Sequence, residues 1–331
     1  MQNKLQTSKL KTLLIYKFLE EFSDEKNPIS TTELIAMLNE KGISAERKSI
    51  YADVEALNKI DCNIISTRSP KRGFFVADRK FNLPEVRLLI DAVSSAGFIT
   101  PNKTKELVDK LESLLSVNQA KALKSQVYCS GESKCDNEEI YYIINGLDEA
   151  INNKKQVKFV YKRRNIDKEQ KKSYTEKIHT VSPYALIWKE DHYYLVCNNK
   201  KYDYLINLRL DRMKKIEILE EPQRPVSEVS EYEVFDSADY SAKMFNMFSG
   251  DTDEVTLLCN LDIREEIMDR FGSKIPLKAA DIDHFETTIH AAVSDGLVSW
   301  IMQYGKDIKV LQPQYLADMV AEKARTIAEL Y

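Results

Sequence analysis

The sequence predicts a multidomain α+β protein. With 331 residues the chain exceeds one ordinary domain, so two or three domains are expected. In the first third, apolar residues recur at helical spacing. In the middle third, runs rich in Tyr, Leu, Ile and Val are separated by polar turns, which is typical of antiparallel strands. The last third alternates strand-like and helix-like segments, which favours a compact α+β unit.

Residues 1–80 predict three helices followed by a β-hairpin. Apolar spacing predicts helices over residues 8–22, 32–40 and 44–57, capped by Ser8, by Ser30 or Thr31, and by Ser44. Residues 63–67 and 73–76 are expected to pair as strands around a basic tip. This order is typical of a winged helix-turn-helix, whose third helix enters the major groove of DNA while the hairpin contacts the flanking backbone.

Polar and basic side chains of this block are candidates for contacts with DNA. The third helix should bury Ile50, Val54 and Leu57, so its N-terminal end can present other side chains to base edges or phosphates. The basic hairpin tip can contact phosphates. The candidate set is Thr31, Arg47, Lys48, Ser49, Tyr51, Arg68, Lys71 and Arg72. The alternative for any one of these residues is an ordinary solvated surface.

Residues 81–137 predict a helical linker. One amphipathic helix opens near Pro84, and a second extends from about Thr104 to Leu123. A polar stretch over residues 130–138 is typical of a loop. Two amphipathic helices without a core of their own need a surface to pack on, either elsewhere in the chain or on a second copy.

Residues 138–222 predict a helix and then a small antiparallel sheet. The helix is expected over residues 139–152 and the first strand over residues 155–161. Residues 154–178 carry a net charge of +7, which indicates a solvated hairpin tip or the rim of an anion pocket. Three further strands are expected between residues 180 and 213. In the last, period-two alternation places Arg209 opposite the Leu and Ile side chains. Arginines beside tyrosines suit an anion with a flat, stackable part.

The remaining chain predicts a connector over residues 223–253 and an α+β domain over residues 254–331. Net charge is +3 over residues 1–80 and −10 over residues 222–331, so nucleic acid is expected at the N-terminal end. No apolar run is long enough for a membrane span and no signal peptide is evident, so a cytoplasmic protein is expected.

The strand-rich segment resembles the WYL domain, a small Sm-like β-barrel named after a Trp-Tyr-Leu triplet. The triplet here is Tyr193-Tyr194-Leu195, which keeps an aromatic ring at the first position but loses the indole N–H, and Pro183, Leu186 and Asp211-Arg212 fit the pattern too. Residues 270–272, 300–305 and 310–313 resemble the C-terminal extension that often follows this domain. The resemblance therefore implies five parts: a winged helix-turn-helix (1–80), a helical linker that contributes to dimerisation (81–137), a WYL domain (138–222), a connector (223–253) and the extension (254–331).

The resemblance also implies a ligand pocket on the barrel. In the family, aromatic and basic residues there bind a signal, in several members a nucleotide or a nucleic-acid fragment. Carried over by position, the candidates are Tyr161, His179, Tyr193, Tyr194, Arg209 and Arg212. Each tyrosine could instead belong to the core, and Arg212 could instead pair with Asp211 or with another carboxylate of the barrel.

Motifs for catalysis and for metal binding are missing from the sequence. It contains no P-loop, no GxGxxG and no GxSxG. Its five cysteines form no CxxC, and its four histidines have no metal-binding spacing. We therefore expect neither an enzyme nor a cofactor.

The predicted function is a ligand-responsive transcriptional regulator. It would bind operator DNA as a homodimer and sense an anionic nucleotide or oligonucleotide with its WYL domain. The alternative is a constitutive nucleic-acid-binding protein in which the barrel itself grips DNA or RNA without a small effector.

Overall fold

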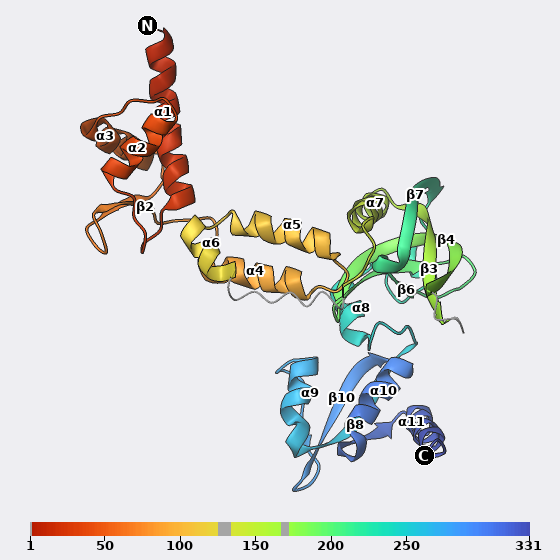
Figure 1. The fold of residues 1–331 in the computed structure, drawn as a ribbon. Coiled ribbons are helices and arrows are strands. Elements are labelled where there is room, and N and C mark those ends of the chain that lie inside the picture. Colours follow the sequence, from red (N-terminus) through yellow and green to blue (C-terminus); the bar gives the residue numbers. More distant parts are fainter. Residues whose placement is uncertain (1, 125–133, 167–171) are drawn as a thin grey trace. The chain divides into compact units, whose positions relative to one another are not determined.

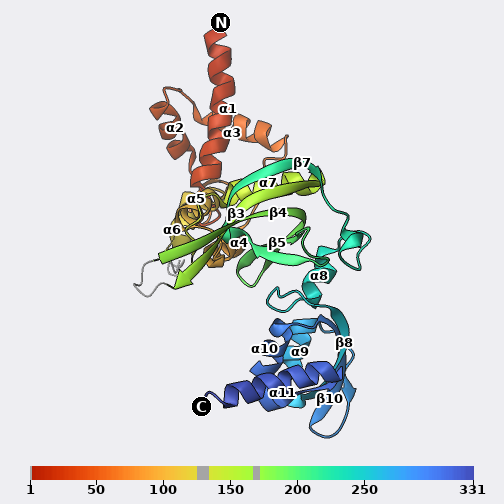
Figure 2. The same cartoon turned by 90° about the vertical axis from the view of Figure 1, so that its right-hand side faces the viewer.

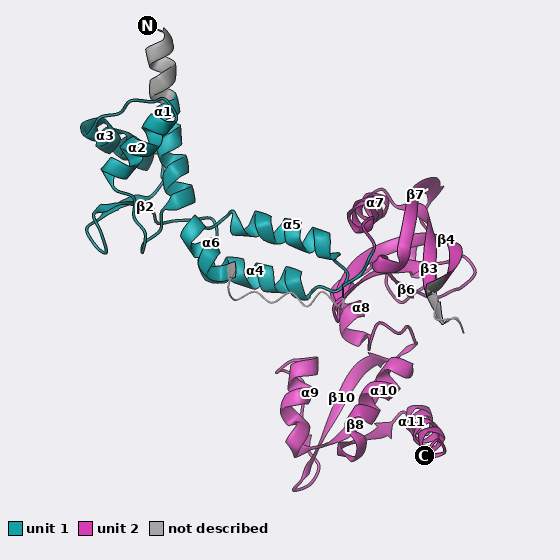
Figure 3. Cartoon of the chain, viewed as in Figure 1, with its two compact units in different colours: residues 1–136 teal, residues 137–331 magenta. Residues whose placement is uncertain are grey.

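The chain folds into two compact units, residues 1–136 and 137–331 (Figure 3). This computed structural model describes residues 2–124, 134–166 and 172–331. Parts of the linker and of the basic hairpin tip expected from the sequence therefore lie outside the described residues. Helices and sheets occur in both units, so the multidomain α+β prediction is confirmed. None of the described helices has the length and hydropathy needed to cross a bilayer.

The first unit begins with three helices and a two-stranded hairpin (Figure 1). These elements are α1 (Gln2–Phe22), α2 (Thr31–Glu40), α3 (Arg47–Asn58), β1 (Ile64–Thr67) and β2 (Gly73–Val76). Ser30, one of the two residues expected to cap α2, is its N-cap, and it forms a capping box with Glu33. The other two expected caps are wrong, because α1 extends past Ser8 and because α3 begins at Arg47 after an N-cap without a side-chain bond.

The core of this part is the predicted apolar face of the three helices closed by the hairpin. Leu34, Leu38, Ile50 and Val54 are buried against Phe74 of β2. Ile29 and Phe74 exchange backbone hydrogen bonds of 2.9 and 2.8 Å, which attach the segment before α2 to the hairpin. The hairpin is thus an integral part of this small core.

Three helices complete the first unit: α4 (Leu83–Ser95), α5 (Pro101–Glu112) and α6 (Val117–Lys124). The predicted second helix of the linker is broken between α5 and α6. There the Ser116 hydroxyl donates a hydrogen bond of 2.5 Å to the carboxylate of the buried Asp24. Arg79 donates to the carbonyls of Glu20 and Ser23 at the C-terminal end of α1, at 2.6 and 2.7 Å. A cation at that end of a helix is favourable, and these bonds join the helices to the preceding core.

The second unit begins with α7 (Ile140–Asn152) and a five-stranded antiparallel sheet in the order β6-β5-β4-β3-β7. The strands are β3 (Lys155–Ile166), β4 (Lys172–Lys189), β5 (His192–Asn198), β6 (Ile206–Arg209) and β7 (Met213–Pro222). α7 packs against β3, β4 and β7 with Ile140, Ile143 and Leu147 buried (Figure 2). β4 pairs with β3 along its first half and with β5 along its second half, so the sheet is strongly staggered.

The expected closed barrel is not formed. β6 and β7 are the two edges of the sheet, and the described strands include no pairing between them. The predicted last strand is also too long, because the chain leaves β6 after Arg209 and forms the 3-10 turn η2 (Leu210–Arg212). That turn carries the chain from β6, which pairs with β5, to β7, which pairs with β3 at the opposite edge.

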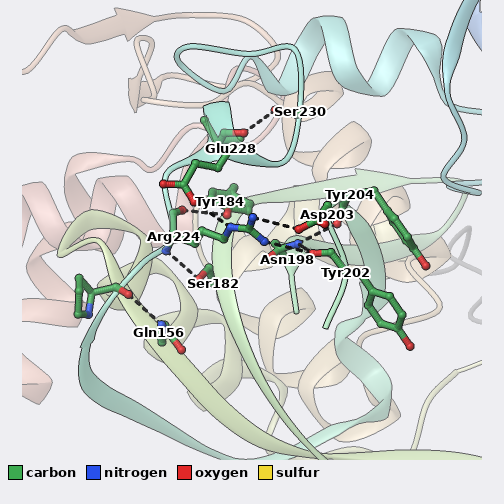
Figure 4. A network of polar contacts seen from close by, with 12 residues as sticks. Gln156, Ser182, Tyr184, Asn198, Tyr202, Asp203, Tyr204, Arg224, Glu228 and Ser230 are labelled. Atoms are coloured by element: carbon green, nitrogen blue, oxygen red, sulfur yellow. Dashed lines mark hydrogen bonds and ion pairs between the residues drawn. The ribbon is translucent and has the colours of Figure 1, made fainter. Parts of the chain in front are cut away.

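A connector joins this sheet to a second sheet within the unit. It contains the 3-10 turn η3 (Val226–Glu228) and α8 (Ser237–Lys243). Arg224 lies at the centre of a polar network, where it donates to Asp203 and Glu228 at 3.0 Å each (Figure 4). Its backbone N–H donates to Ser182 at 2.9 Å. The start of the connector is thereby attached to β4 and to the loop before β6.

The C-terminal part is a four-stranded antiparallel sheet, in the order β11-β8-β10-β9, packed against helices. Its strands are β8 (Thr252–Asn260), β9 (Lys278–Ala279), β10 (His284–Ala292) and β11 (Ile308–Gln312). Its helical elements are η4 (Leu261–Ile263), α9 (Arg264–Phe271), α10 (Asp295–Gln303), η5 (Gly305–Asp307) and α11 (Gln314–Ala328). Period-two burial along β8 and β10 supplies Val255, Leu257, Phe285 and Ile289 to the core.

Candidate nucleic-acid and ligand surfaces

The N-terminal end of α3 presents basic side chains to solvent. Ile50 and Val54 face the core, so the helical period leaves Arg47 and Lys48 exposed. Ser49 is half-buried, and its hydroxyl donates a hydrogen bond of 2.8 Å to the Glu46 carbonyl within the same turn of the chain. Thr31, the first residue of α2, is also half-buried.

Tyr51 joins α3 to the hairpin. Its ring packs edge-on against Phe74 at 5.3 Å between centroids, and the Arg47 guanidinium lies 6.0 Å from its centre. A hydrogen bond from Arg47 lowers the pKa of Tyr51, and the charge of Arg72 acts in the same direction. The fold therefore brings Arg47, Tyr51 and Arg72 together on one surface.

The hairpin tip is exposed at Arg68, Lys71 and Arg72. Lys71 is already paired, since its ammonium lies 2.7 Å from the Glu33 carboxylate. Partial burial opposes ionisation of this carboxylate, but hydrogen bonds from Lys71 and Ser30 lower the pKa of Glu33 to about 2. Lys71 is therefore a weaker candidate for a phosphate contact than Arg72.

A second group of candidate residues lies on the five-stranded sheet. The Phe159 and His179 rings are stacked with centroids 5.9 Å apart, and Tyr161 meets His179 edge-on at 5.5 Å. Tyr161 is buried, with 5% of its surface exposed, and its hydroxyl accepts from the Arg209 backbone N–H at 3.3 Å. Tyr161 therefore has a packing role in addition to any contact with a ligand.

The surroundings of His179 are basic. Burial lowers the pKa of His179, and the charges of Arg163, Lys177 and Lys201 lower it further. These three cations are exposed, so the neutral imidazole lies beside positive charge that solvent can reach. Such an arrangement attracts anions.

Arg209 pairs with Asp211. Its Nε and Nη2 atoms lie 3.0 and 2.7 Å from the two carboxylate oxygens, a bidentate contact. Burial opposes the charge of the guanidinium, yet the Asp211 carboxylate raises the pKa of Arg209. The sequence had left open a pair between Asp211 and Arg212, whereas the structure shows Arg209 in that contact and Arg212 exposed.

The two tyrosines of the triplet lie in different surroundings. Burial raises the pKa of Tyr194, and Arg209, Asp211 and Arg212 all act on its hydroxyl. Burial also raises the pKa of Tyr193, and the charge of Asp148 of α7 acts in the same direction. Tyr194 therefore belongs with the arginines, and Tyr193 faces the helix, as expected for adjacent residues of a strand.

Two residues near this cluster escaped the sequence analysis. His192 meets Tyr194 edge-on at 6.2 Å, and burial followed by the charge of Arg209 lowers the pKa of His192. The sequence could have indicated His192, because residues two apart on a strand lie on the same face and His192 is two residues before Tyr194. Asn137 is buried and donates from Nδ2 to the carbonyls of Asp211 and Met213, at 3.2 and 2.7 Å. Nothing in the sequence indicates that contact, because its partners lie more than 70 residues away.

A large hollow of the second unit has a lining that includes none of these residues. It has a volume of about 790 Å³ and lies between the sheet, the connector and the start of β8. The described side chains that line it include four carboxylates, those of Asp203, Glu228, Glu231 and Asp251, and no Lys or Arg. Because its described lining offers no Lys or Arg to pair with an anion, the anion candidate remains the Arg209 cluster.

Comparisons with known proteins agree with this architecture. Residues 142–218 match the WYL domain family and residues 251–328 match the WCX domain family. The chain is 20% identical over 296 residues to the uncharacterized HTH-type transcriptional regulator YobV of Bacillus subtilis (strain 168), covering 86% of this chain and 89% of that protein. It is also similar to a solved structure, proteasome accessory factor B/C (PafBC) of Arthrobacter aurescens, at 13% identity and a TM-score of 0.27. That match covers 94% of this chain and 47% of the other, so the chain spans about half the length of that protein. With both domains present in the expected order and a likeness to an HTH-type regulator over 86% of this chain, the chain belongs to the WYL-domain transcriptional regulator family.

Proposed function

We propose that this protein is a DNA-binding transcriptional regulator that works as a homodimer in the cytoplasm and responds to an anionic, nucleotide-like ligand. The observation that carries the proposal is the pair of separate basic surfaces, one on α3 and the hairpin and one around Arg209. The likeness to an HTH-type transcriptional regulator supports the DNA-binding half.

In this proposal residues 1–80 of the first unit form a winged helix-turn-helix. α3 enters the major groove, where Arg47 and Lys48 reach base edges or phosphates, and the hairpin follows the adjacent backbone. Tyr51 holds Arg47 near Arg72, so one phosphate can meet both guanidinium groups. Arg68 supplies a further phosphate contact from the exposed tip.

The WYL sheet is the ligand sensor. Arg209 and Arg212 recognise a phosphate, and Tyr194 with the imidazoles of His179 and His192 offers rings for a base. Tyr161 positions this surface, since it is buried and bonded to the backbone of Arg209. Tyr193 supports the sheet from the side of α7.

Dimerisation is assigned to the helical linker. Leu88 and Leu89 of α4 are 70% and 38% exposed, and the buried core of this helical part is small. A second copy packing on this face would place two α3 helices for half-sites of one operator.

Asn137 offers a route from the sensor to the rest of the chain. It is the first residue of the second unit, and its amide is bonded to the backbone of the turn that carries Asp211 and Arg212. A ligand that binds one arrangement of this turn more tightly than another would shift the equilibrium between two states of the chain.

The alternative is a constitutive nucleic-acid-binding protein, in which the sheet grips DNA or RNA. The observation in its favour is that Arg209 is occupied by Asp211 rather than open to a small anion.

The test is a fluorescence-anisotropy titration of the full chain with DNA from its own promoter. It would be run at fixed salt, with and without mono- and cyclic nucleotides and short oligonucleotides. The proposal expects sequence-selective binding that one of these ligands shifts. Selective binding that none of them shifts would keep the regulator and contradict the ligand sensor. Binding without sequence selectivity that none of them shifts would favour the constitutive alternative.

Exchanging Arg47 and Lys48 for Ala should weaken operator binding by about tenfold or more, because each contact to a base or phosphate contributes on the order of 1 kcal/mol. The matched control is Lys59→Ala, which removes a cation just after the other end of α3 and should change affinity little. Equal affinities for the two variants would contradict the assignment of α3 as the recognition helix.

A further inference from the structure

In the proposed anion site, the carboxylate of Asp211 already binds the guanidinium of Arg209. The Nε and Nη2 atoms of Arg209 lie 3.0 and 2.7 Å from the two Asp211 carboxylate oxygens. Nε and Nη2 form one of the donor pairs with which a guanidinium can bind a phosphate bidentately. The side chains are 24% and 12% exposed, so water competes weakly for this pair. A phosphate and the Asp211 carboxylate therefore cannot occupy these donors together.

The pair is built into the backbone. Arg209 ends β6, and η2 folds Asp211 back toward it two residues later. The Arg209 N–H is bonded to Tyr161 and the Asp211 carbonyl is bonded to Asn137, so both residues are held from outside the turn. The backbone on both sides of the contact is thus held in place, which keeps the two side chains within reach of each other.

We propose that Asp211 gates the anion site, so that a ligand binds by displacing the Asp211 carboxylate from Arg209. The inference rests on the anion site of the proposed function. A ligand group with one negative charge replaces one carboxylate contact by another and gains little. An anion with several charges can hold Arg209 and also pair with the exposed Arg212. The site is therefore selective for polyanions, such as adjacent phosphate groups, over monoanions.

The test measures binding of inorganic pyrophosphate to the full chain by isothermal titration calorimetry. Asp211→Asn removes the competing charge and should tighten binding roughly tenfold, since a hydrogen-bonded charge pair contributes about 1.5 kcal/mol. The matched control is Asp191→Asn, which removes an exposed carboxylate whose charge also reaches His192. Asp191 has a φ of 59°, which Asn tolerates, and its loss should tighten binding by no more than about threefold.

The second measurement compares the affinity for a polyanion with the affinity for a monoanion. In the wild-type protein pyrophosphate should bind more tightly than acetate, and Asp211→Asn should narrow that difference. If Asp211→Asn and Asp191→Asn tighten pyrophosphate binding equally, Asp211 does not gate the site. In that case, loss of pyrophosphate binding in Arg209→Ala would still support the anion site itself. If neither the wild type nor any variant binds pyrophosphate, both the gate and the anion site are contradicted. If circular dichroism shows that Asp211→Asn is unfolded, Asp211→Ser replaces it in the same comparison.

Discussion

Gly73 shows how a single position can be determined by a distant backbone segment. A Cβ atom at this residue would lie 2.6 Å from the carbonyl oxygen of Ile29, closer than any real contact of that kind. The approach is close because Ile29 and Phe74 exchange backbone hydrogen bonds. A side chain at position 73 would separate the hairpin from the segment that precedes α2.

The Gly73→Ala variant should therefore be destabilised by about 1–3 kcal/mol, the usual cost of overpacking. Thermal unfolding followed by circular dichroism would measure it. Gly42→Asn is the control, since Gly42 has a φ of 74° with open space around it and Asn tolerates that conformation. A melting temperature of Gly73→Ala equal to that of the control would contradict the close approach.

At the scale of elements, the pair between Glu33 and Lys71 connects α2 to the hairpin tip. Glu33 closes the capping box with Ser30 and holds the Lys71 ammonium at 2.7 Å. Both side chains are about half exposed, so the pair contributes little to stability and serves mainly to hold the tip beside α2.

This pair should give a defined dependence of stability on pH. The pKa of Glu33 is lowered from 4.5 to about 2, so its contribution is fully present above about pH 4.5 and is lost as pH falls through about 2. The gap in free energy of unfolding between wild type and Glu33→Gln should therefore shrink across this range, as measured by urea unfolding. Glu40→Gln, at the other end of α2, is the control. A gap that stays constant down to pH 2 would show that the pair does not stabilise the folded unit.

At the scale of the whole molecule, the chain between the two units is short. Within the first unit, Cys135 donates its backbone N–H to the Gly97 carbonyl at 2.8 Å. Within the second unit, Asn137 is bonded to the backbone of η2 and β7. Only Asp136 lies between these attached residues, so a movement of η2 acts on the covalent connection to the first unit.

Asn137→Ala should uncouple the two surfaces without removing either. Operator affinity in the absence of ligand should stay within about twofold of wild type and pyrophosphate should still bind, while the effect of ligand on operator binding is lost. Anisotropy and calorimetry on the same preparation would measure all three quantities. Asn260→Ala, which removes a turn-capping Asn in the WCX domain, is the control and should keep the response. A normal response in Asn137→Ala would place the coupling elsewhere.

The sequence by itself determined the local elements and the family. Helical spacing located α2 and α3 and the buried face of α3, and the Tyr193-Tyr194-Leu195 triplet identified the WYL domain. Only the tertiary structure decided that the sheet stays open and that Arg209, not Arg212, holds Asp211. Only the tertiary structure also showed that the Asn137 amide donates to the backbone of η2 and that the backbone of Gly73 packs closely against Ile29. The reason is physical: a repeat of two or 3.6 residues determines which face a side chain lies on, so neighbours in the chain reveal it. Which atoms then meet on that face depends on chain segments brought together from tens of residues away, and on small differences in where a strand ends and a turn begins.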